Sequence, residues 1–308
     1  MKSHVHFAII GILGCIGAVG CGGSASSDGT GGGGADSTTS TGEVSTTGSG
    51  GGSASACALA DSTSPTATVS PSGCHVLNRD TSACEAARKA AGLSGYWLKL
   101  SCRVELSVAS DVVTAKSDSR PDYPSYYFPK GDACYQDYAK GIHNPFDLLA
   151  ESLVVKFSLT PDMAPKTMMG IPVVGMAVNG VPFFANFAGG PNGADAIYTE
   201  AKTFDACGAH PQEQGEYHYH AEPTAITYDD ANFVGVLRDG YPLYGRKDTD
   251  GSYPTLDTYG GHTGITADSA GAAVYHYHVN EQTSTGSTTA GQKQWFVTTG
   301  TFRGTPYM

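Results

Sequence analysis

Short apolar runs separated by polar and turn-forming residues dominate the chain after Tyr96. Residues 99–113 alternate in part, residues 152–159 form a β-branched run, and Pro and Gly recur at short spacing. Such alternation and frequent turn residues are typical of β-strands joined by tight turns. No later segment shows a convincing period of 3.6 residues. We therefore expect residues 96–308 to form a mainly β domain.

A short helix is expected before this domain. Ser82-Ala83-Cys84-Glu85 has the pattern of a capping box, and the Ala-rich residues 85–91 are followed by Gly92, a helix stop signal. Residues 57–95 also contain three cysteines. We interpret residues 57–95 as a small Cys-rich segment that contains the helix.

Three sequence elements occur twice in the β region, in the same order. The first carries Asn-Gly or Asp-Gly between apolar runs, the strongest short-range hairpin signal, and the third is the tetrapeptide Tyr-His-Tyr-His. The copies are residues 174–184 and 234–244, residues 205–210 and 257–262, and residues 217–220 and 275–278. Two repeats are too few for a solenoid. We expect a single pseudo-two-fold β domain built from two related halves, about residues 171–222 and 231–280.

Residues 1–20 are predicted to be a lipoprotein signal peptide. Lys2 provides a positive charge, and residues 5–19 form an apolar run that is too short to span a bilayer. The run ends at Ala18-Val19-Gly20-Cys21, which resembles a bacterial lipobox, in which the cysteine is lipidated and becomes the mature N-terminus. A plain signal peptide cleaved nearby is one alternative. Ile12-Leu13-Gly14-Cys15 is a rival lipobox, but it leaves a very short apolar region.

Residues 21–56 are predicted to be a disordered tether. They are almost all Gly, Ser, Thr and Ala, and such a segment cannot bury enough apolar surface to offset the entropy of ordering. We therefore expect an exported protein that is lipid-anchored in the bacterial cell envelope, at the outer membrane or the cell surface. Its expected partner is the lipid bilayer, reached through the N-terminal anchor.

Charge indicates which partners the protein can bind, and cysteine content indicates whether it contains disulfides. The 308 residues include 18 Lys and Arg against 29 Asp and Glu, a net charge of −11, so we expect no nucleic-acid partner, which would need a basic face. Without Cys15 of the signal and the lipidated Cys21, six cysteines remain. An even number in an oxidising compartment predicts up to three disulfides and no free thiol, with the pairing left open. The candidates are Cys57, Cys74, Cys84, Cys102, Cys134 and Cys207.

The histidines are concentrated in the repeated elements. In a strand, residues i and i+2 project from one face, so Tyr-His-Tyr-His places two imidazoles on one side, about 6.5–7 Å apart at Cα, and two phenols on the other. In each half a third histidine follows glycines that allow a tight turn. Three neutral imidazoles suit a transition metal such as copper or zinc. The predicted metal ligands are His210, His218, His220, His262, His276 and His278.

Acidic residues near these histidines suggest supporting roles. Asp205 and Asp257 each lie five residues before the third histidine of their half. Each carboxylate has two equally good roles: to accept a hydrogen bond from the N–H of a ligating imidazole, or to stabilise the turn itself.

Two glutamates flank only the first tetrapeptide. On a continuous strand, Glu216 and Glu222 face the same side as His218 and His220. We hypothesise that any catalysis belongs to the first half, with these carboxylates as a general base or an extra ligand. The alternative is that both are solvated strand ends.

The sequence resembles the YHYH domain proteins. The resemblance rests on the two tetrapeptides, on the Asp-Gly-Tyr-Pro-Leu-Tyr-Gly run at 239–245 and on Leu256-Asp257 with Gly261-His262-Thr263. Residues 119–123 resemble an upstream Pro-Asp element more loosely. The resemblance covers residues from Tyr96 to the C-terminus and implies an exported bacterial protein, but it implies no particular reaction.

Three classes of function agree with these observations. The first is a cell-envelope lipoprotein that binds a transition metal through its histidines. The second is a metal-dependent enzyme, hydrolytic with zinc or oxidative with copper. The third is a tethered adhesion or glycan-binding β module with structural histidines. We favour metal binding and leave open whether the protein is an enzyme.

Overall fold

The structure is a computed structural model that describes residues 68, 70–137, 143–164, 167–169, 173–187, 200–284 and 290–307. All of them belong to one compact unit, Gly52–Met308. The predicted signal peptide, the tether, the lipidation site Cys21 and the cysteine Cys57 lie outside the described residues. Within these ranges, no helix has the length and apolar character that a membrane span needs.

The predicted helix is present, but its N-terminus is not a capping box. α1 (Ser82–Ala90) has Thr81 as its N-cap, with no side-chain cap. The backbone N–H of Ser82 instead donates to Asp80 Oδ1 at 2.8 Å. Glu85 pairs with Lys89 one turn later rather than turning back toward the cap. The expected box fails because Ser82 is already the first helical residue.

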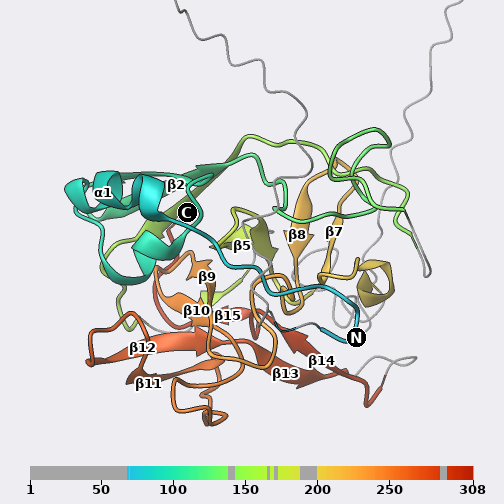
Figure 1. Ribbon diagram of the computed structural model, residues 1–308. Coiled ribbons are helices and arrows are strands. Elements are labelled where there is room, and N and C mark those ends of the chain that lie inside the picture. The colour runs from blue at the N-terminus through green and yellow to red at the C-terminus, as the bar shows by residue number, and fades with distance from the viewer. Residues whose placement is uncertain are drawn as a thin grey trace, which may run out of the picture. The chain divides into compact units, whose positions relative to one another are not determined.

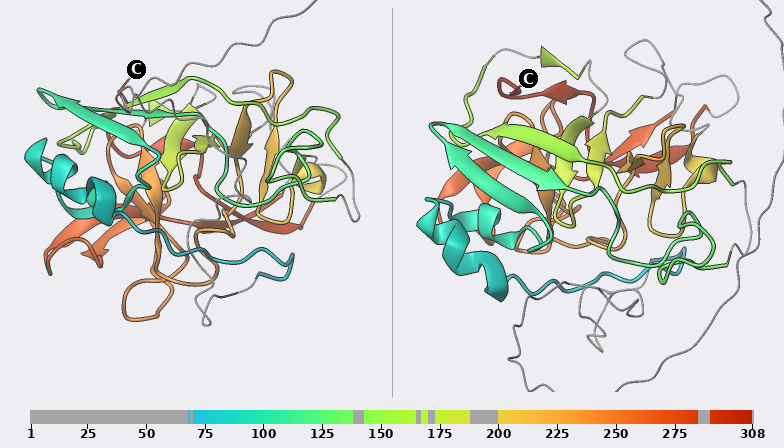
Figure 2. Two further views of the ribbon diagram at one scale, coloured as in Figure 1. Left: turned by 45° about the horizontal axis from the view of Figure 1, so that its top comes forward. Right: turned by 90° about the horizontal axis from the view of Figure 1, so that it is seen from above.

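A three-stranded antiparallel sheet follows the 3₁₀ helix η1 (Gly95–Lys99). It consists of β1 (Glu105–Ala109), β2 (Val112–Ser117) and β3 (Leu153–Ser158), in that order. Buried and exposed residues alternate along β3, as its β-branched run predicts. The buried side chains pack with Trp97 against Met176 and Val236 of the larger sheet. In Figures 1 and 2, α1 lies beside this sheet and away from β7 and β8.

An eight-stranded sheet forms the centre of the fold, in the order β11-β12-β10-β9-β5-β6-β8-β7. The antiparallel pair β5·β9 joins two sets of four strands. In each set, the second strand of the hairpin (β6 or β10) pairs in parallel with the strand of the tetrapeptide (β8 or β12). The tetrapeptide strand then pairs antiparallel with the edge strand (β7 or β11). The strands are β5 (Val173–Ala177), β6 (Pro182–Phe184), β7 (Ala209–Pro211), β8 (Tyr217–Tyr219), β9 (Phe233–Leu237), β10 (Pro242–Tyr244), β11 (Gly261–Ile265) and β12 (Ala273–His278).

The two Asn-Gly and Asp-Gly signals mark real turns. They connect β5 to β6 and β9 to β10, and Gly180 and Gly240 have φ values of +89° and +92°. This left-handed region suits glycine because it has no Cβ. A Cβ at Gly180 would also lie 2.5 Å from Ser117 Oγ, so the first hairpin packs closely on β2.

Short elements and disulfides complete the fold. β4 (Thr167–Met168) pairs with β15 (Thr301–Phe302), β13 (Asn280–Thr283) pairs with β14 (Lys293–Phe296), and η2 (Ala201–Thr203) is a 3₁₀ turn. Disulfides join Cys74 to Cys207 and Cys84 to Cys102, and Cys134 is also disulfide-bonded. The prediction of a mainly β fold is confirmed. Every cysteine among the described residues forms a disulfide, as expected.

Candidate metal centres

The tetrapeptides place histidines and tyrosines on opposite faces of the sheet. His218 and His220 have their Nε2 atoms 3.1 Å apart. On the other face, Tyr123 OH hydrogen-bonds both Tyr217 OH at 2.9 Å and Tyr219 OH at 2.8 Å. The alternation of side chains along a strand produces this separation. The phenols are therefore buried, hydrogen-bonded core residues.

The structure brings the six predicted histidines into two groups, one in each half. The first centre consists of His210, His218 and His220, with the Glu200 carboxylate beside two of them. His210 on β7 lies directly opposite His218 on β8. Glu200, which precedes η2, places Oε2 3.3 Å from His220 Nε2 and 3.8 Å from His210 Nε2. Three imidazoles thus converge at the edge of the sheet, and the Glu200 carboxylate lies beside two of them.

Hydrogen bonds at Nδ1 fix the direction of each imidazole in the first centre. His218 Nδ1 donates to Glu216 O at 3.0 Å, and His220 Nδ1 donates to Ala185 O at 2.6 Å. Because a carbonyl oxygen only accepts, the proton lies on Nδ1 and the Nε2 lone pair is free for a metal. His210 Nδ1 contacts Thr203 Oγ1 at 2.7 Å, and its buried Nε2 has no hydrogen-bond partner.

Burial keeps these imidazoles neutral. It lowers the pKa of His210 to about 3 and that of His220 to about 4, and it lowers the pKa of His218 well below its usual value. Repulsion from His220 adds to the lowering of the pKa at His210 and His218. Burial also raises the pKa of Glu200 to about 7. Neutral imidazole is the form that binds metal.

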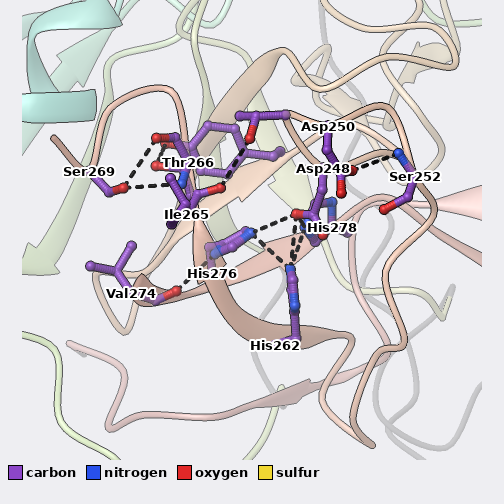
Figure 3. Close-up of polar contacts among 12 residues, drawn as sticks. Asp248, Asp250, Ser252, His262, Ile265, Thr266, Ser269, Val274, His276 and His278 are labelled. Atoms are coloured by element: carbon purple, nitrogen blue, oxygen red, sulfur yellow. Dashed lines mark hydrogen bonds and ion pairs between the residues drawn. The ribbon is translucent and has the colours of Figure 1, made fainter. Parts of the chain in front are cut away.

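The second centre consists of His262, His276, His278 and Asp248 (Figure 3). His262 on β11 lies opposite His276 on β12, and Asp248 follows β10. His276 Nδ1 donates to Val274 O at 2.9 Å, and His278 Nδ1 donates to Gly245 O at 2.7 Å. Burial lowers the pKa of both, to about 4 for His278. These carbonyls match Glu216 O and Ala185 O of the first centre.

The donor atoms of the second centre are spaced like a tetrahedral metal cage. Asp248 Oδ1 lies 3.1, 3.6 and 3.5 Å from the Nε2 atoms of His262, His276 and His278. His262 Nε2 lies 3.1 Å from His276 Nε2 and 3.2 Å from His278 Nε2. Four ligands at the zinc bond lengths of about 2.0–2.1 Å would be about 3.3 Å apart. The cage therefore has the size that a first-row transition metal needs.

The two carboxylates were not anticipated from the sequence. Glu200 and Asp248 lie outside the three repeated elements, and they occupy different positions relative to their histidines. A carboxylate in a polar loop is normally solvated, so its sequence gives no sign of a ligand role. Only the three-dimensional approach of these loops to the imidazoles identifies them.

Glu216 and Glu222 do not lie beside the imidazoles as expected. β8 ends at Tyr219, so the alternation does not extend to Glu222. Glu222 instead forms a buried ion pair with Arg246, with 2.9 Å between Oε1 and Nε, and Glu216 accepts a hydrogen bond from Gln212 at 2.8 Å. Within the described structure neither carboxylate contacts a histidine side chain. Their catalytic role stays an untested hypothesis.

Asp205 and Asp257 stabilise turns and anchor tyrosines. Asp205 Oδ1 accepts the N–H of Cys207 at 2.9 Å, and Asp257 Oδ1 accepts the N–H of Tyr259 at 2.9 Å. Asp257 also accepts Tyr275 OH at 3.1 Å. Among the contacts of the described ranges, neither aspartate accepts a hydrogen bond from an imidazole. The turn role fits, and backbone carbonyls orient the imidazoles instead.

Comparison with known proteins agrees with the tetrapeptide resemblance over part of the chain. Residues 154–254 match the family model described as YHYH protein. This range contains all of the first centre and Asp248, is narrower than the resemblance from Tyr96 onward, and ends before the second tetrapeptide. No curated protein and no solved structure matches the chain. Residues 154–254 of the chain are thus similar to the YHYH protein family.

Proposed function

We propose that this protein binds one transition-metal ion in each of its two centres. The spacing of the four donor atoms in the second centre carries the proposal, because five separations of 3.1–3.6 Å match a metal cage. The first centre supports it through the buried His210 Nε2, which has no hydrogen-bond partner among the described residues. A buried polar atom without a partner is costly, and a metal ion would use its lone pair.

We propose zinc rather than copper for the second centre. Asp248 and the three histidines supply four ligands, and the five separations of 3.1–3.6 Å agree with a tetrahedral arrangement. Zinc prefers tetrahedral nitrogen and oxygen sites, whereas Cu²⁺ prefers square-planar or tetragonal ones. A set of four protein ligands also resembles structural zinc sites, which leave no position open.

We further propose that the two halves are related by a pseudo-two-fold axis between β5 and β9. Corresponding strands pair in the same way on each side, and corresponding carbonyls orient corresponding imidazoles. The tyrosine anchors also match, since Tyr219 contacts Asn179 and Tyr277 contacts Asp239 at the equivalent hairpin turns. This relation accounts for the presence of two centres in one chain.

We propose that the protein works outside the cytoplasm, anchored to the cell envelope through a lipid on Cys21. The lipobox-like sequence and the polar residues 21–56 support this placement. The disulfides support it independently, because disulfides persist in oxidising compartments.

Metal analysis of variants that remove one centre tests the proposal. The purified protein, loaded with zinc and then dialysed, is expected to retain two ions per chain by mass spectrometry. His218→Ala/His220→Ala and His276→Ala/His278→Ala should each retain one, and the exposed His75→Ala, outside both centres, should retain two. Co²⁺ in the second centre should give the strong visible absorption of tetrahedral cobalt. Protein that retains no metal would refute the proposal.

A further inference from the structure

The two centres differ in how firmly the sheet holds their third histidine. β7, which carries His210, pairs with β8 through three residue pairs, and one of them involves Pro211, which has no N–H. β11, which carries His262, pairs with β12 through five. Both strands lie at an edge of the sheet. The sheet alone therefore restrains His210 less than His262.

The turns that lead into these strands have the same hydrogen bonds. In the first half, Asp205 N donates to Ala209 O at 2.8 Å and Gly208 N donates to Asp205 O at 3.1 Å. In the second half, Asp257 makes the equivalent pair of bonds at 2.8 and 3.1 Å. The turn conformation thus needs no cross-link, because the second half forms it without one.

The third residue of the turn is where the halves diverge. Cys207 is bonded to Cys74, with their Cα atoms 5.2 Å apart and 133 residues between them in sequence. Its counterpart Tyr259 packs instead beneath the Arg303 guanidinium, 5.3 Å from the ring centre. The first half therefore has a disulfide that the second half lacks at this position, and its Cys207 lies three residues before His210.

The segment that carries Cys74 is itself well fixed. Leu77 N donates to Ala225 O at 3.0 Å, and Arg79 forms a buried ion pair with Asp122 at 2.6 Å. Cys74 and Cys207 are both buried, at 5% and 4% exposure. The bond thus ties the turn before β7 to a part of the chain that cannot easily move.

We propose that the Cys74–Cys207 disulfide is a positioning element of the first metal centre, and that breaking it weakens metal binding there but not at the second centre. The inference rests on the proposed function. A dithiol would break the bond by giving two electrons and two protons to its sulfurs, leaving two cysteine thiols and the oxidised dithiol. The first centre is then redox-sensitive and the second is not.

The test uses variants that isolate each centre. Cys74→Ser/Cys207→Ser is placed in the His276→Ala/His278→Ala background, which keeps the first centre, and in the His218→Ala/His220→Ala background, which keeps the second. Zinc affinity is measured against a competing chelator. The dissociation constant should rise about tenfold at the first centre, as when a group that orients a ligand is removed, and should change less than twofold at the second.

A matched control and a spectroscopic readout separate positioning from general destabilisation. Cys84→Ser/Cys102→Ser removes the other disulfide of known pairing and should change neither centre. The visible spectrum of Co²⁺ should shift only in the first centre when Cys74–Cys207 is absent. If the variant fails to fold, titration of the intact single-centre proteins with a phosphine reductant tests the same difference.

Different results overturn different claims. Equal weakening at both centres, or no weakening at the first, refutes the positioning role and leaves the proposed function intact. A parent protein with intact disulfides that binds no metal refutes the proposed function, and the inference with it.

Discussion

The two centres share their imidazoles but not their carboxylates. In both, three histidines come from corresponding strands, and the two of the tetrapeptide are oriented by corresponding carbonyls. The carboxylate comes from the start of η2 in the first centre and from the loop after β10 in the second. Glu200 Oε2 lies within 3.8 Å of two Nε2 atoms, whereas Asp248 Oδ1 lies within 3.6 Å of three. The repeat therefore specifies the imidazoles, whereas the carboxylate beside each set comes from an unrelated loop.

Removal of metal should produce the largest effect. With free zinc at 1,000 times the dissociation constant, each occupied centre stabilises the folded state by about 4 kcal/mol. Urea denaturation with and without a chelator measures the free energy of unfolding that is lost with the metal. The loss should be twice this value in the wild type and equal to it in each double-histidine variant. An unchanged midpoint after chelation would argue that the histidines are structural.

Acid should destabilise the metal-free protein. The pKa values of His210 and His220 are about 3 and 4 in the folded state, below the ordinary 6.5, so the unfolded state binds more protons. Their contribution to stability is complete above pH 6.5 and is lost as the pH falls through 6.5 toward 4. Glu200, with its pKa raised to about 7, opposes them in part, because its contribution is lost as the pH rises.

For His210 and His220 together, the expected loss between pH 6.5 and pH 5 is on the order of 3 kcal/mol before the opposing contribution of Glu200. Urea midpoints of the metal-free protein at both values measure it. The variant His218→Ala/His220→Ala should lose less stability than the wild type over the same interval. A midpoint that rises on acidification would contradict the assignment of neutral, buried imidazoles.

Neutralising the carboxylates should separate the centres. Asp248→Asn is expected to weaken zinc binding at the second centre about 100-fold, and Glu200→Gln should weaken the first about tenfold, because Glu200 approaches fewer imidazoles. Chelator competition in single-centre backgrounds gives both values. Asp250→Asn is the matched control and should have no effect, because Asp250 pairs with Ser252 and contacts no imidazole within the described structure. Equal losses would remove the proposed difference between the cages.

The smallest effect is expected from Glu216→Gln. Its carboxylate contacts Gln212 and not an imidazole, while its backbone carbonyl, which orients His218, is unchanged. Zinc affinity should change less than about threefold and stability by less than about 1 kcal/mol. A large loss of zinc affinity would indicate that Glu216 is a metal ligand.

The sequence predicts the features that depend on local periodicity. Alternation in Tyr-His-Tyr-His predicts which side chains share a face, and Asn-Gly and Asp-Gly predict the hairpins, because both follow from backbone geometry within a few residues. The third histidine is recognisable through its repeated turn. The mainly β fold and the short helix follow from the same local patterns.

Features that depend on distant loops escape this reasoning. Glu200 and Asp248 approach the imidazoles only through the tertiary placement of their loops, which no spacing in the sequence encodes. Alternation predicts that Glu222 continues the strand of His220, but β8 ends at Tyr219. The Glu222 carboxylate forms an ion pair with Arg246, which lies in a neighbouring loop. Pairing of an acidic side chain with a distant cation is a tertiary outcome, and local alternation cannot anticipate it.

His218 and His276 take their orientation from their own strands. Each donates its Nδ1 proton to the carbonyl two residues earlier, Glu216 O or Val274 O, so no neighbouring strand is needed to aim the ring. For protein design, a strand histidine with this hydrogen bond would be a candidate metal ligand that orients itself. Engineering a new site then reduces to supplying one parallel neighbour to hold the second imidazole, one turn for the third, and any loop that brings a carboxylate within reach.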